Sequence, residues 1–403
     1  MTWTLALRNL LRQPARSLTT LFAIVVGVAS LILSAGFVRD IVAQLGEAFI
    51  SSQTGHIQIA VPQYFASANR ATGEVLLHDA PALRKAASAV PGVADVMGRL
   101  SFSGVLNNGR RDYSILGFGV EPAAESRLGT GLHIVAGRDL TATDEFGALL
   151  GEGLATALGV GPGEPLTLLA STPDGAMNTI DVEVVGTFRS FSKDFDARAL
   201  RLPLRAAQTL LDTDGVNVLV LRLDETAQTD LIAQRLRQQL GPRLAVREWH
   251  TLSDFYEKTV ALYRRQFGVL QLIVLAMVLL SVANSVNMSA FERIPEFGTL
   301  RALGTRNGAL RTLILTETLV LGLVGAVLGA IAGMGLARLV SFVGIPMPPA
   351  PGSDVGYIAH ISPAFTDVAS AAAIGLVATV LAGIPPAVRC ARLPITDALR
   401  RAI

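Results

Sequence analysis

The chain is poor in the residues that build disulfide frameworks, metal sites and nucleotide-binding loops. Its 403 residues include a single cysteine, Cys390, which excludes an internal disulfide. The 5 histidines are dispersed without paired metal-ligand spacing, so we predict no metal site. The glycine-rich phosphate loop that ends in lysine and serine or threonine is missing, and no lysine follows a glycine. We therefore predict no catalytic site, no resident cofactor and no ATP site of the chain's own.

Charge is also scarce, and its two signs nearly cancel. Charged residues make up 16% of the chain against 51% hydrophobic residues, and the formal net charge is +2. The mean hydropathy of +0.48 exceeds the usual balance of a soluble protein. So small a net charge does not support a general attraction to nucleic acid. The positions of the charges therefore matter more than their sum.

Long apolar runs are what the chain does contain, and Glu317 is the one charged residue within them. Each run holds at least the roughly 20 residues that cross about 30 Å of hydrocarbon as a helix, whereas buried helices of soluble proteins seldom stay uncharged so long. We predict transmembrane helices at residues 17–38, 267–291, 312–337 and 368–388. The predicted fold is an α-helical membrane protein with four transmembrane helices and an α+β extracytoplasmic domain inserted between helices 1 and 2.

Arginine positions predict the orientation. Arginines occur in residues 1–16, 292–311 and 389–403, whereas the stretch from Ser341 to Asp367, within the loop 338–367, has no lysine or arginine. Short cytoplasmic loops retain positive charge, so both termini and loop 292–311 are predicted to be cytoplasmic. Residues 39–266 would then form a periplasmic domain outside the bacterial inner membrane. The first apolar run is too long for a usual signal peptide, which favours an uncleaved anchor.

The first 16 residues interleave apolar side chains with arginines. This pattern favours a short amphipathic helix on the lipid headgroups of the cytoplasmic leaflet, interrupted at Pro14. An ordinary basic flank of the first span explains the same residues equally well. The sequence leaves these two interpretations open.

The domain at 39–266 shows both strand and helix patterns. Alternation and turn residues predict strands at residues 55–61, 166–170, 180–188, 216–223 and 244–249, with a hairpin turn at Asn107–Gly109. Helices are predicted at 80–90 and 226–240. Helical spacing also continues outward from the first span to Phe49 and inward from Leu252 to the second span. These extensions predict two stalk helices, with ordinary amphipathic ends as the alternative.

The loop 292–311 predicts a short helix. Pro295 suits a first helical turn, and Glu296 follows at the positive end of the helix dipole. Phe297, Leu300 and Leu303 are expected to form an exposed apolar stripe. Such a helix fits a docking surface for a partner, although it could equally lie on the membrane.

Small residues mark one face of the third span. Gly325 and Gly329 are spaced by four along with Gly333, and Gly322 lies nearby, so this face permits close helix packing. Dimerisation and packing within the chain would both use it. Glu317 lies in the same span and either has a buried partner or reaches the membrane interface.

The chain resembles the permeases of MacB/FtsX-like ABC transporters, and its pieces are most similar to the lipoprotein-releasing branch. The similar pieces are Leu5 to Arg12, Leu149 to Ala155 with Leu158 to Val160, Val185 to Phe188, Glu292 to Gly304, Pro385 to Ala387, and Arg392 to Arg400. The combination is specific, although each piece alone is weak. Pro295 departs from the polar or charged residue usual at its position in the family.

The resemblance implies an ATPase-coupling helix, a role carried onto Glu292, Arg293, Glu296, Gly298, Leu300, Arg301, Ala302, Leu303 and Gly304. It also implies a separate cytoplasmic ABC ATPase dimer that binds ATP and Mg, since no ATPase domain is fused to this sequence. A second permease copy or a paralogue would complete the transporter. A periplasmic carrier, an adaptor or a lipoprotein substrate is the further partner implied.

Three functions agree with this resemblance. The first is extraction or export of a lipoprotein or other amphiphile, driven by ATPase motion transmitted across the membrane. The second is an FtsX-like activator of a periplasmic cell-wall hydrolase, in which nothing is transported. The third is efflux of a small molecule. The sequence leaves the substrate and the choice between a homodimer and a heterodimer open.

Overall fold

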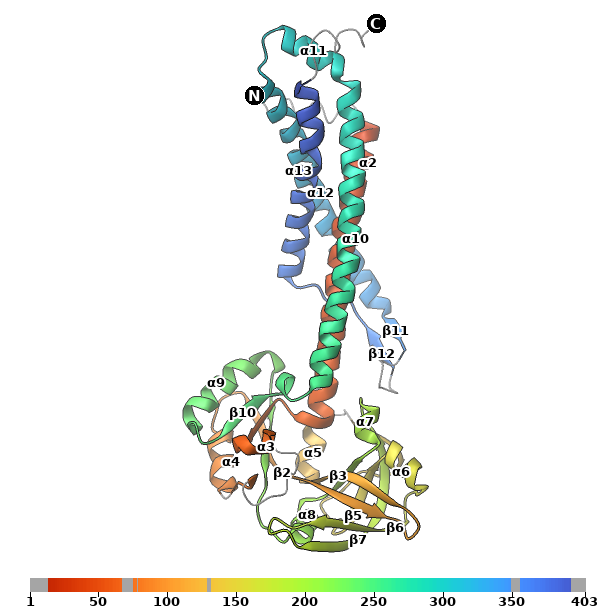
Figure 1. Cartoon of the computed structure of the whole chain (residues 1–403), viewed down its shortest axis with the longest axis vertical. Coiled ribbons are helices and arrows are strands. Elements are labelled where there is room, and N and C mark those ends of the chain that lie inside the picture. The colour runs from red at the N-terminus through yellow and green to blue at the C-terminus, as the bar shows by residue number, and fades with distance from the viewer. Residues whose placement is uncertain (1–13, 67–74, 78, 129–131, 349–355, 393–403) are drawn as a thin grey trace. The chain divides into compact units, whose positions relative to one another are not determined.

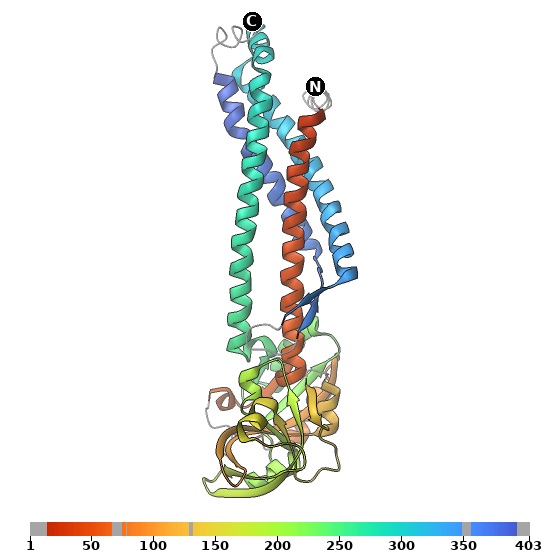
Figure 2. The same ribbon diagram turned by 90° about the vertical axis from the view of Figure 1, so that its right-hand side faces the viewer.

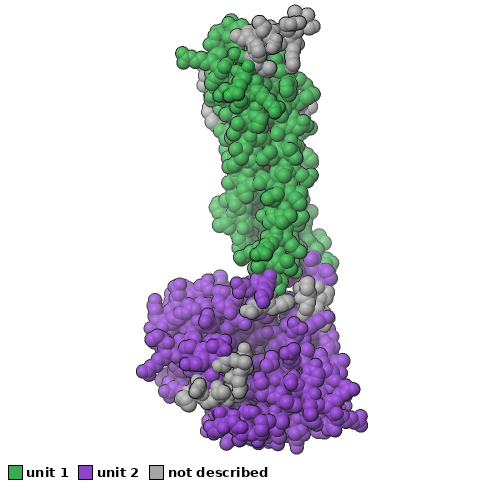
Figure 3. All heavy atoms as spheres, viewed as in Figure 1, with its two compact units in different colours: residues 1–42, 259–346, 358–403 green, residues 43–258, 347–357 purple. Residues whose placement is uncertain are grey.

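The computed structural model of the chain describes residues 14–66, 75–77, 79–128, 132–348 and 356–392. The chain divides into two compact units, coloured separately in Figure 3. The helical unit comprises residues 1–42, 259–346 and 358–403, and the sheet unit comprises residues 43–258 and 347–357.

The helical unit is built from long apolar helices and the short helix α11 (Figure 1). Its helices are α2 (Pro14–Phe49), α10 (Asp254–Glu292), α11 (Ile294–Ala302), α12 (Asn307–Val343) and α13 (Phe365–Arg392). Within the described residues, 4 of them are long and apolar enough to cross a membrane. Figure 2 shows these long helices alongside one another, with α2 in red and α10 in green. These four helices all extend beyond the apolar runs from which the spans are predicted.

Two predicted segments at the chain ends fall partly outside the described residues. The amphipathic segment predicted at 1–16 lies outside them as far as residue 13, and the tail predicted at 389–403 lies outside them from residue 393. The loop predicted at 338–367 contains a feature that the sequence pattern does not indicate. In it β11 (Ile345–Met347) pairs with β12 (Tyr357–Ala359) as a two-stranded sheet.

The sheet unit contains a ten-stranded mixed sheet. Its strands are β1 (Ile57–Ala60), β2 (Val93–Asn107), β3 (Asp112–Val120), β4 (His133–Gly137), β5 (Gly147–Gly151), β6 (Pro165–Ser171), β7 (Met177–Arg189), β8 (Ala199–Pro203), β9 (Val218–Leu223) and β10 (Ala245–Glu248). β2 pairs with β9 through its first half and with β3 and β6 through its second half. This long strand therefore belongs to two lobes of the sheet.

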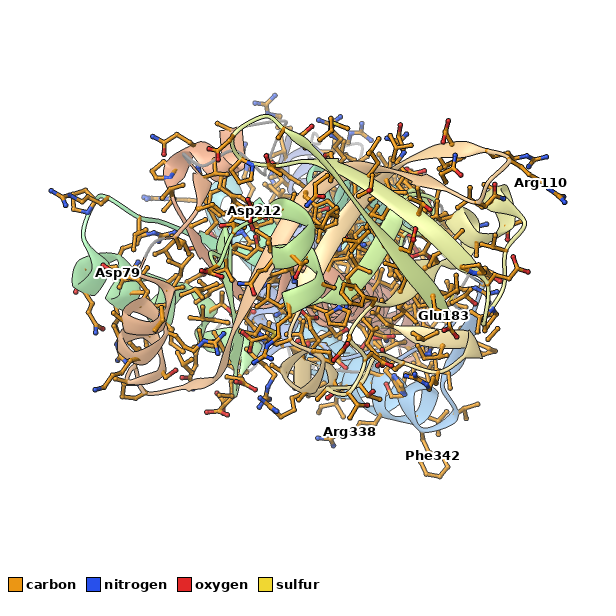
Figure 4. The ribbon with its side chains drawn as sticks, turned by 90° about the horizontal axis from the view of Figure 1, so that it is seen from below. Asp79, Arg110, Glu183, Asp212, Arg338 and Phe342 are labelled. Carbon is orange, nitrogen blue, oxygen red and sulfur yellow. The ribbon has the colours of Figure 1, made fainter. Side chains whose placement is uncertain are left out.

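One lobe is a closed ring of strands. The pairing runs from β2 through β3, β8, β5, β7 and β6 and returns to β2, with parallel pairs at β3–β8 and β5–β7. Closure pairs each strand of the ring on both sides and encloses a core that includes Leu100, Phe102, Leu150 and Leu200, while β4 pairs with β7 outside the ring. We call this part the barrel lobe. At its tip, the predicted β2–β3 hairpin turn projects Arg110 away from the sheet (Figure 4).

The other lobe, which we call the open lobe, is an antiparallel sheet in the order β10, β1, β9, β2. The helices α4 (Ala80–Ser88) and α9 (Thr229–Leu240) pack their apolar side chains on it. Ile57 and Ile59 of β1 and Leu236 of α9 are among the residues of this core. The described residues thus confirm the predicted fold class: four helices able to span a membrane, with an α+β domain between the first two.

Short elements complete the sheet unit. They are the π-helix η1 (Ile50–Thr54), α3 (Pro62–Ala66), α5 (Pro122–Leu128), α6 (Glu152–Leu158), α7 (Lys193–Asp196), α8 (Leu204–Leu211), η3 (Thr226–Gln228) and η4 (Trp249–Thr251). η1 follows α2 without a break, so the first long helix continues into the sheet unit as far as Thr54. α10 likewise begins at Asp254, only a few residues after η4.

Candidate functional site

The short helix α11 connects α10 and α12, at the place where the sequence predicts a helix. It starts after Arg293, whose backbone carbonyl accepts a hydrogen bond from the amide of Phe297 at 3.0 Å. Pro295 occupies the first turn, where its missing N–H costs no hydrogen bond. The helix ends before Gly304, which has a φ of +94°. Glycine adopts this left-handed conformation without the steric cost that other residues incur, so Gly304 suits the end of the helix.

Arg293 anchors this helix to α12. Its Nη1 donates a hydrogen bond to Oε2 of Glu317 at 2.7 Å, and its Nε donates to Oε2 of Glu296 at 3.2 Å. The guanidinium also lies 5.1 Å from the ring centroid of Phe297. The side chains of Arg293 and Glu317 are only 14% and 15% exposed. The sequence leaves two interpretations of Glu317, a buried partner or the membrane interface. In the structure its carboxylate is paired with Arg293.

One face of α11 is packed into the helical unit. Ile294, Phe297 and Gly298 are buried, and the ring of Phe297 lies in a cluster with Leu310, Ile314, Ala387 and Cys390. The expected exposed stripe is therefore wrong for Phe297, which is 3% exposed. A spacing of three residues leaves successive side chains about 60° apart around a helix. The stripe of residues 297, 300 and 303 therefore spreads across roughly 120°, and Phe297 at its start faces the interior of the helical unit.

The opposite face of α11 is open. Leu300 is 38% exposed, and Leu303, the residue that caps the end of the helix, is 80% exposed. Of the other residues predicted to couple to the ATPase, Arg301 is half-buried, and four are exposed: Glu292, Glu296, Ala302 and Gly304. An anchored helix with adjacent exposed leucines and charged neighbours can bind a complementary protein surface.

The glycine face of α12 packs within the chain. A Cβ built on Gly325 would lie 2.6 Å from Ile24, one on Gly329 would lie 2.7 Å from Val28, and one on Gly333 would lie 3.0 Å from Ile32. These partners follow one another at intervals of four on α2. Gly322 instead meets α13, where its Cβ would lie 3.0 Å from Leu376. Of the two uses predicted for this face, the structure shows close packing of α12 against α2 and α13.

Sequence reasoning missed a buried cluster of charges in the sheet unit. Glu125 of α5 accepts hydrogen bonds from Arg99 Nη2 at 2.6 Å and from Arg201 Nη1 at 3.2 Å. All three side chains are at most 7% exposed. Burial alone would raise the pKa of Glu125, but the two guanidinium charges outweigh it and hold this pKa below its ordinary value.

The same arginines cap a helix. Arg99 Nη1 donates to the carbonyl oxygen of Gln53, and Arg201 Nη2 donates to that of Ser52 at 2.6 Å. Both carbonyls belong to η1, whose end carries the negative pole of the helix dipole. The only sequence signal for this cluster is a lone arginine inside each of two apolar strand segments.

The described residues contain no group of three or more histidine, cysteine, aspartate or glutamate side chains able to hold a metal ion. His56 is buried in the open lobe, where its Nε2 lies 3.0 Å from the hydroxyl of Thr226 and its Nδ1 accepts from the amide of Leu223 at 3.3 Å. These contacts give His56 a structural place in the fold.

Two family models match the chain. The MacB-like periplasmic core domain matches residues 17–239, and the FtsX-like permease C-terminal region matches residues 268–395. The first match alone covers more than half of the chain. The second contains α11 and both of the long helices that follow it.

Individual proteins are similar to the chain at lower coverage. The lipoprotein-releasing system transmembrane protein LolE of Haemophilus influenzae is 24% identical over 285 residues, which cover 69% of this chain and 68% of LolE. LolC of Xylella fastidiosa is 25% identical over 271 residues, covering 64% of this chain and 65% of LolC. The chain thus spans about two thirds of the length of these curated relatives. The crystal structure of the periplasmic region of MacB from Actinobacillus actinomycetemcomitans matches with 13% identity and a TM-score of 0.35, covering 53% of this chain and 95% of that structure.

Proposed function

The chain belongs to the MacB/FtsX-like family of ABC transporter permeases, and from this premise we propose that it transmits the motion of a cytoplasmic ATPase to its periplasmic domain. The observation that carries the proposal is the two-faced helix α11. Its buried face joins it to α12 through Arg293 and Phe297, while its open face presents Leu300 and Leu303. A partner that displaces the open face therefore also displaces the helices beneath it.

The motor in this proposal is a separate ABC ATPase dimer, which binds ATP and Mg. The arginines that flank α11 support a cytoplasmic position for it, since short cytoplasmic loops retain positive charge. Leu303 and Leu300 would enter an apolar groove of the ATPase, and Arg301 and Glu292 would lie at the rim. Anchors of this kind contribute most of the binding energy when they are fully buried in a partner.

The path to the periplasmic domain runs along α2 and α10. α2 continues into η1 as far as Thr54, and α10 starts at Asp254, so each helix contains residues of both units. A continuous helix transmits displacement along its length because each turn is hydrogen-bonded to the next. We infer that these two helices are the stalk through which the sheet unit is moved.

The cargo that fits this arrangement best is a lipoprotein or another amphiphile, extracted from the membrane and passed to a periplasmic carrier or adaptor. The names of the relatives LolE and LolC, which are lipoprotein-releasing system proteins, support this choice. A second permease copy or a paralogue would complete the membrane part of the transporter. Work on the cargo would be done by the periplasmic domain and powered from the cytoplasm.

Replacement of Leu303 by arginine tests the coupling surface. Because Leu303 is 80% exposed, the substitution should not disturb the fold, yet it places a charge in the proposed apolar contact. We expect an ABC ATPase to co-purify with the wild-type chain from detergent-solubilised membranes of the source organism. The Leu303→Arg variant should retain less than about a tenth of it, since losing one apolar anchor costs at least 1.4 kcal/mol. Quantitative mass spectrometry of the eluate measures the ratio.

The matched control is Leu231→Arg. Leu231 is 50% exposed on α9 in the sheet unit, so this variant adds the same charge far along the chain from α11. It should retain the ATPase at the wild-type level. Full retention of the ATPase by Leu303→Arg would show that α11 is not the docking surface. A peptidoglycan hydrolase in the wild-type eluate would instead support a regulatory function.

A further inference from the structure

A cavity of about 420 Å³ lies in the sheet unit where the barrel lobe meets the open lobe. Its lining includes Arg99 of β2, Arg201 of β8, Tyr64, Phe65 and Arg247. Cavities of about 300 to 1,000 Å³ are the size at which proteins hold small ligands. The cavity belongs entirely to this unit and is separate from α11.

The buried part of the cavity lining is cationic. Arg99 and Arg201 both pair with the carboxylate of Glu125, and Asp139 is a second acidic residue whose charge acts on Arg201 from outside the cavity lining. Among the described residues that line the cavity there is no aspartate or glutamate. Nε of Arg201 is buried and has no hydrogen-bond partner in the described residues. A buried cation with incomplete compensation favours a bound anion.

The mouth of the cavity repeats this chemistry. Arg247 of β10 is exposed, and its guanidinium lies 6.0 Å from the ring centroid of Phe65. The apolar side chains of Phe118, Phe195 and Leu252 also line the cavity. The cavity therefore combines buried and exposed cationic groups with aromatic walls.

We propose that this cavity binds an anionic amphiphile, with a phosphate or carboxylate headgroup at Arg201 and Arg247 and a short apolar segment against Phe118 and Phe195. The guanidinium of Arg201 is held in place before binding by Glu125 and by the carbonyl of Ser52. Such preorganisation lowers the entropy cost of binding. Capping of η1 explains Arg99 and Arg201, but it requires neither a cavity nor Arg247.

This inference adds a ligand site to the proposed coupling function without resting on it. Binding by the purified chain needs no ATPase, whereas the co-purification test needs no ligand. A negative result in the binding experiment therefore does not contradict the coupling function, and a negative result in the co-purification test does not contradict the ligand site.

The test uses the full chain in detergent and hexyl phosphate as the probe, measured by isothermal titration calorimetry. We expect saturable binding of hexyl phosphate at one site, weaker binding of inorganic phosphate, and no saturable binding of 1-hexanol. Equal affinity for inorganic phosphate and hexyl phosphate would show that the apolar segment contributes nothing and that the cavity is a plain anion site. Equal affinity for hexanol and hexyl phosphate would show that the anionic headgroup is not recognised. The absence of hexyl phosphate binding would contradict the proposed site itself.

The variant Arg247→Gln connects this binding to the cavity. Arg247 is exposed, so its loss should leave the fold intact, and removing one charge-assisted hydrogen bond should raise the Kd for hexyl phosphate roughly tenfold. The matched control is Arg243→Gln, an exposed arginine nearby in sequence that does not line the cavity. An unchanged Kd in Arg247→Gln, or an equal rise in both variants, would overturn the proposal.

Discussion

Glu125 illustrates how a single carboxylate can hold two strands and a helix together. It accepts hydrogen bonds from Arg99 of β2 and Arg201 of β8, and both arginines also bind carbonyls of η1. A buried ion pair contributes little beyond its desolvation cost while it is intact. Removal of one partner is strongly destabilising, because it leaves a buried charge without compensation. Glu125 is therefore the residue of this cluster whose loss should be most costly.

The substitution Glu125→Gln is expected to lower the free energy of unfolding of the sheet unit by about 3 kcal/mol, since two buried guanidinium groups would lose their shared counter-charge. Tryptophan fluorescence during thermal unfolding of the full chain in detergent measures the change as a lower midpoint. Glu145→Gln, at an exposed glutamate, is the matched control and should leave the midpoint unchanged. An equal midpoint for both variants would contradict the stabilising function of the cluster.

The same variants give a pH readout whose sign follows from the pKa of Glu125. This pKa is lower in the folded chain than the ordinary value, so the unfolded chain takes up the proton first as the pH falls. The stabilisation is complete above the ordinary glutamate pKa of about 4.3 and is lost as the pH falls through the folded value. Acidification below about pH 4.3 should thus narrow the difference between the wild-type chain and Glu125→Gln.

This cluster was not predictable from the sequence, for a physical reason. Arg99, Glu125 and Arg201 lie on three elements, and no local spacing rule brings them together. Glu317 and Arg293 form the comparable case in the helical unit. There the sequence indicates that a carboxylate within a span needs a partner, but the partner is decided by how α11 folds back beside α12.

At the scale of elements, strands whose sequence alternates were predictable, and two buried strands without alternation were not. β6 alternates, with Leu166, Leu168 and Ala170 buried between more exposed neighbours, and a strand is predicted there. β5 and β8 are five-residue strands that are buried at every position, so they lack the alternation that marks a strand with one solvated face. The first half of β2 was missed as well, and it holds Arg99.

The sequence predicted which face of α12 packs closely, but it did not predict which helix packs against that face. The spacing of glycines on α12 indicates a close approach, and helices of the same chain or of a second copy would satisfy it equally. The structure shows that Ile24, Val28 and Ile32 of α2 fill the face. Their spacing of four matches that of the glycines, as expected when ridges of one helix pack into grooves of another.

Gly325→Ala tests this packing. Alanine favours a helix over glycine by about 1 kcal/mol, so the substitution would stabilise α12 if space allowed. At this position the new methyl group would lie 2.6 Å from Cγ2 of Ile24, and we expect overpacking to cost about 1–3 kcal/mol. The thermal midpoint of the chain in detergent should fall.

The control for this packing prediction is Gly335→Ala on the same helix. Apart from the neighbouring backbone of its own helix, no atom of the described residues lies within 4 Å of a Cβ built on Gly335, so this variant should keep or raise the midpoint through helix propensity alone. A midpoint for Gly325→Ala at or above that of Gly335→Ala would show that α2 and α12 do not pack as closely as the structure has them.

At the scale of the whole molecule, the sequence indicates which segments suit lipid and which suit water. The absence of charge over long runs predicts the helices that can span a membrane, because the cost of placing charge in hydrocarbon does not depend on the tertiary fold. The closed ring of the barrel lobe was beyond prediction. It depends on pairs such as β2 with β6, in which Gly104 meets Ala170, and local patterns carry no information on such distant partners.

Orientation in the membrane remains a prediction, and the single cysteine makes it testable. In a Cys390→Ser background, Thr299→Cys introduces a thiol on the exposed face of α11, and Arg243→Cys introduces one on the exposed surface of the sheet unit. The arginine pattern places α11 in the cytoplasm and the sheet unit in the periplasm. A membrane-impermeant maleimide added to spheroplasts should therefore label Arg243→Cys at once. It should reach Thr299→Cys only after the membrane is permeabilised. Labelling of both thiols from the same side would exclude the transmission of ATPase motion across the membrane, because the docking helix and the domain it moves would then share one compartment.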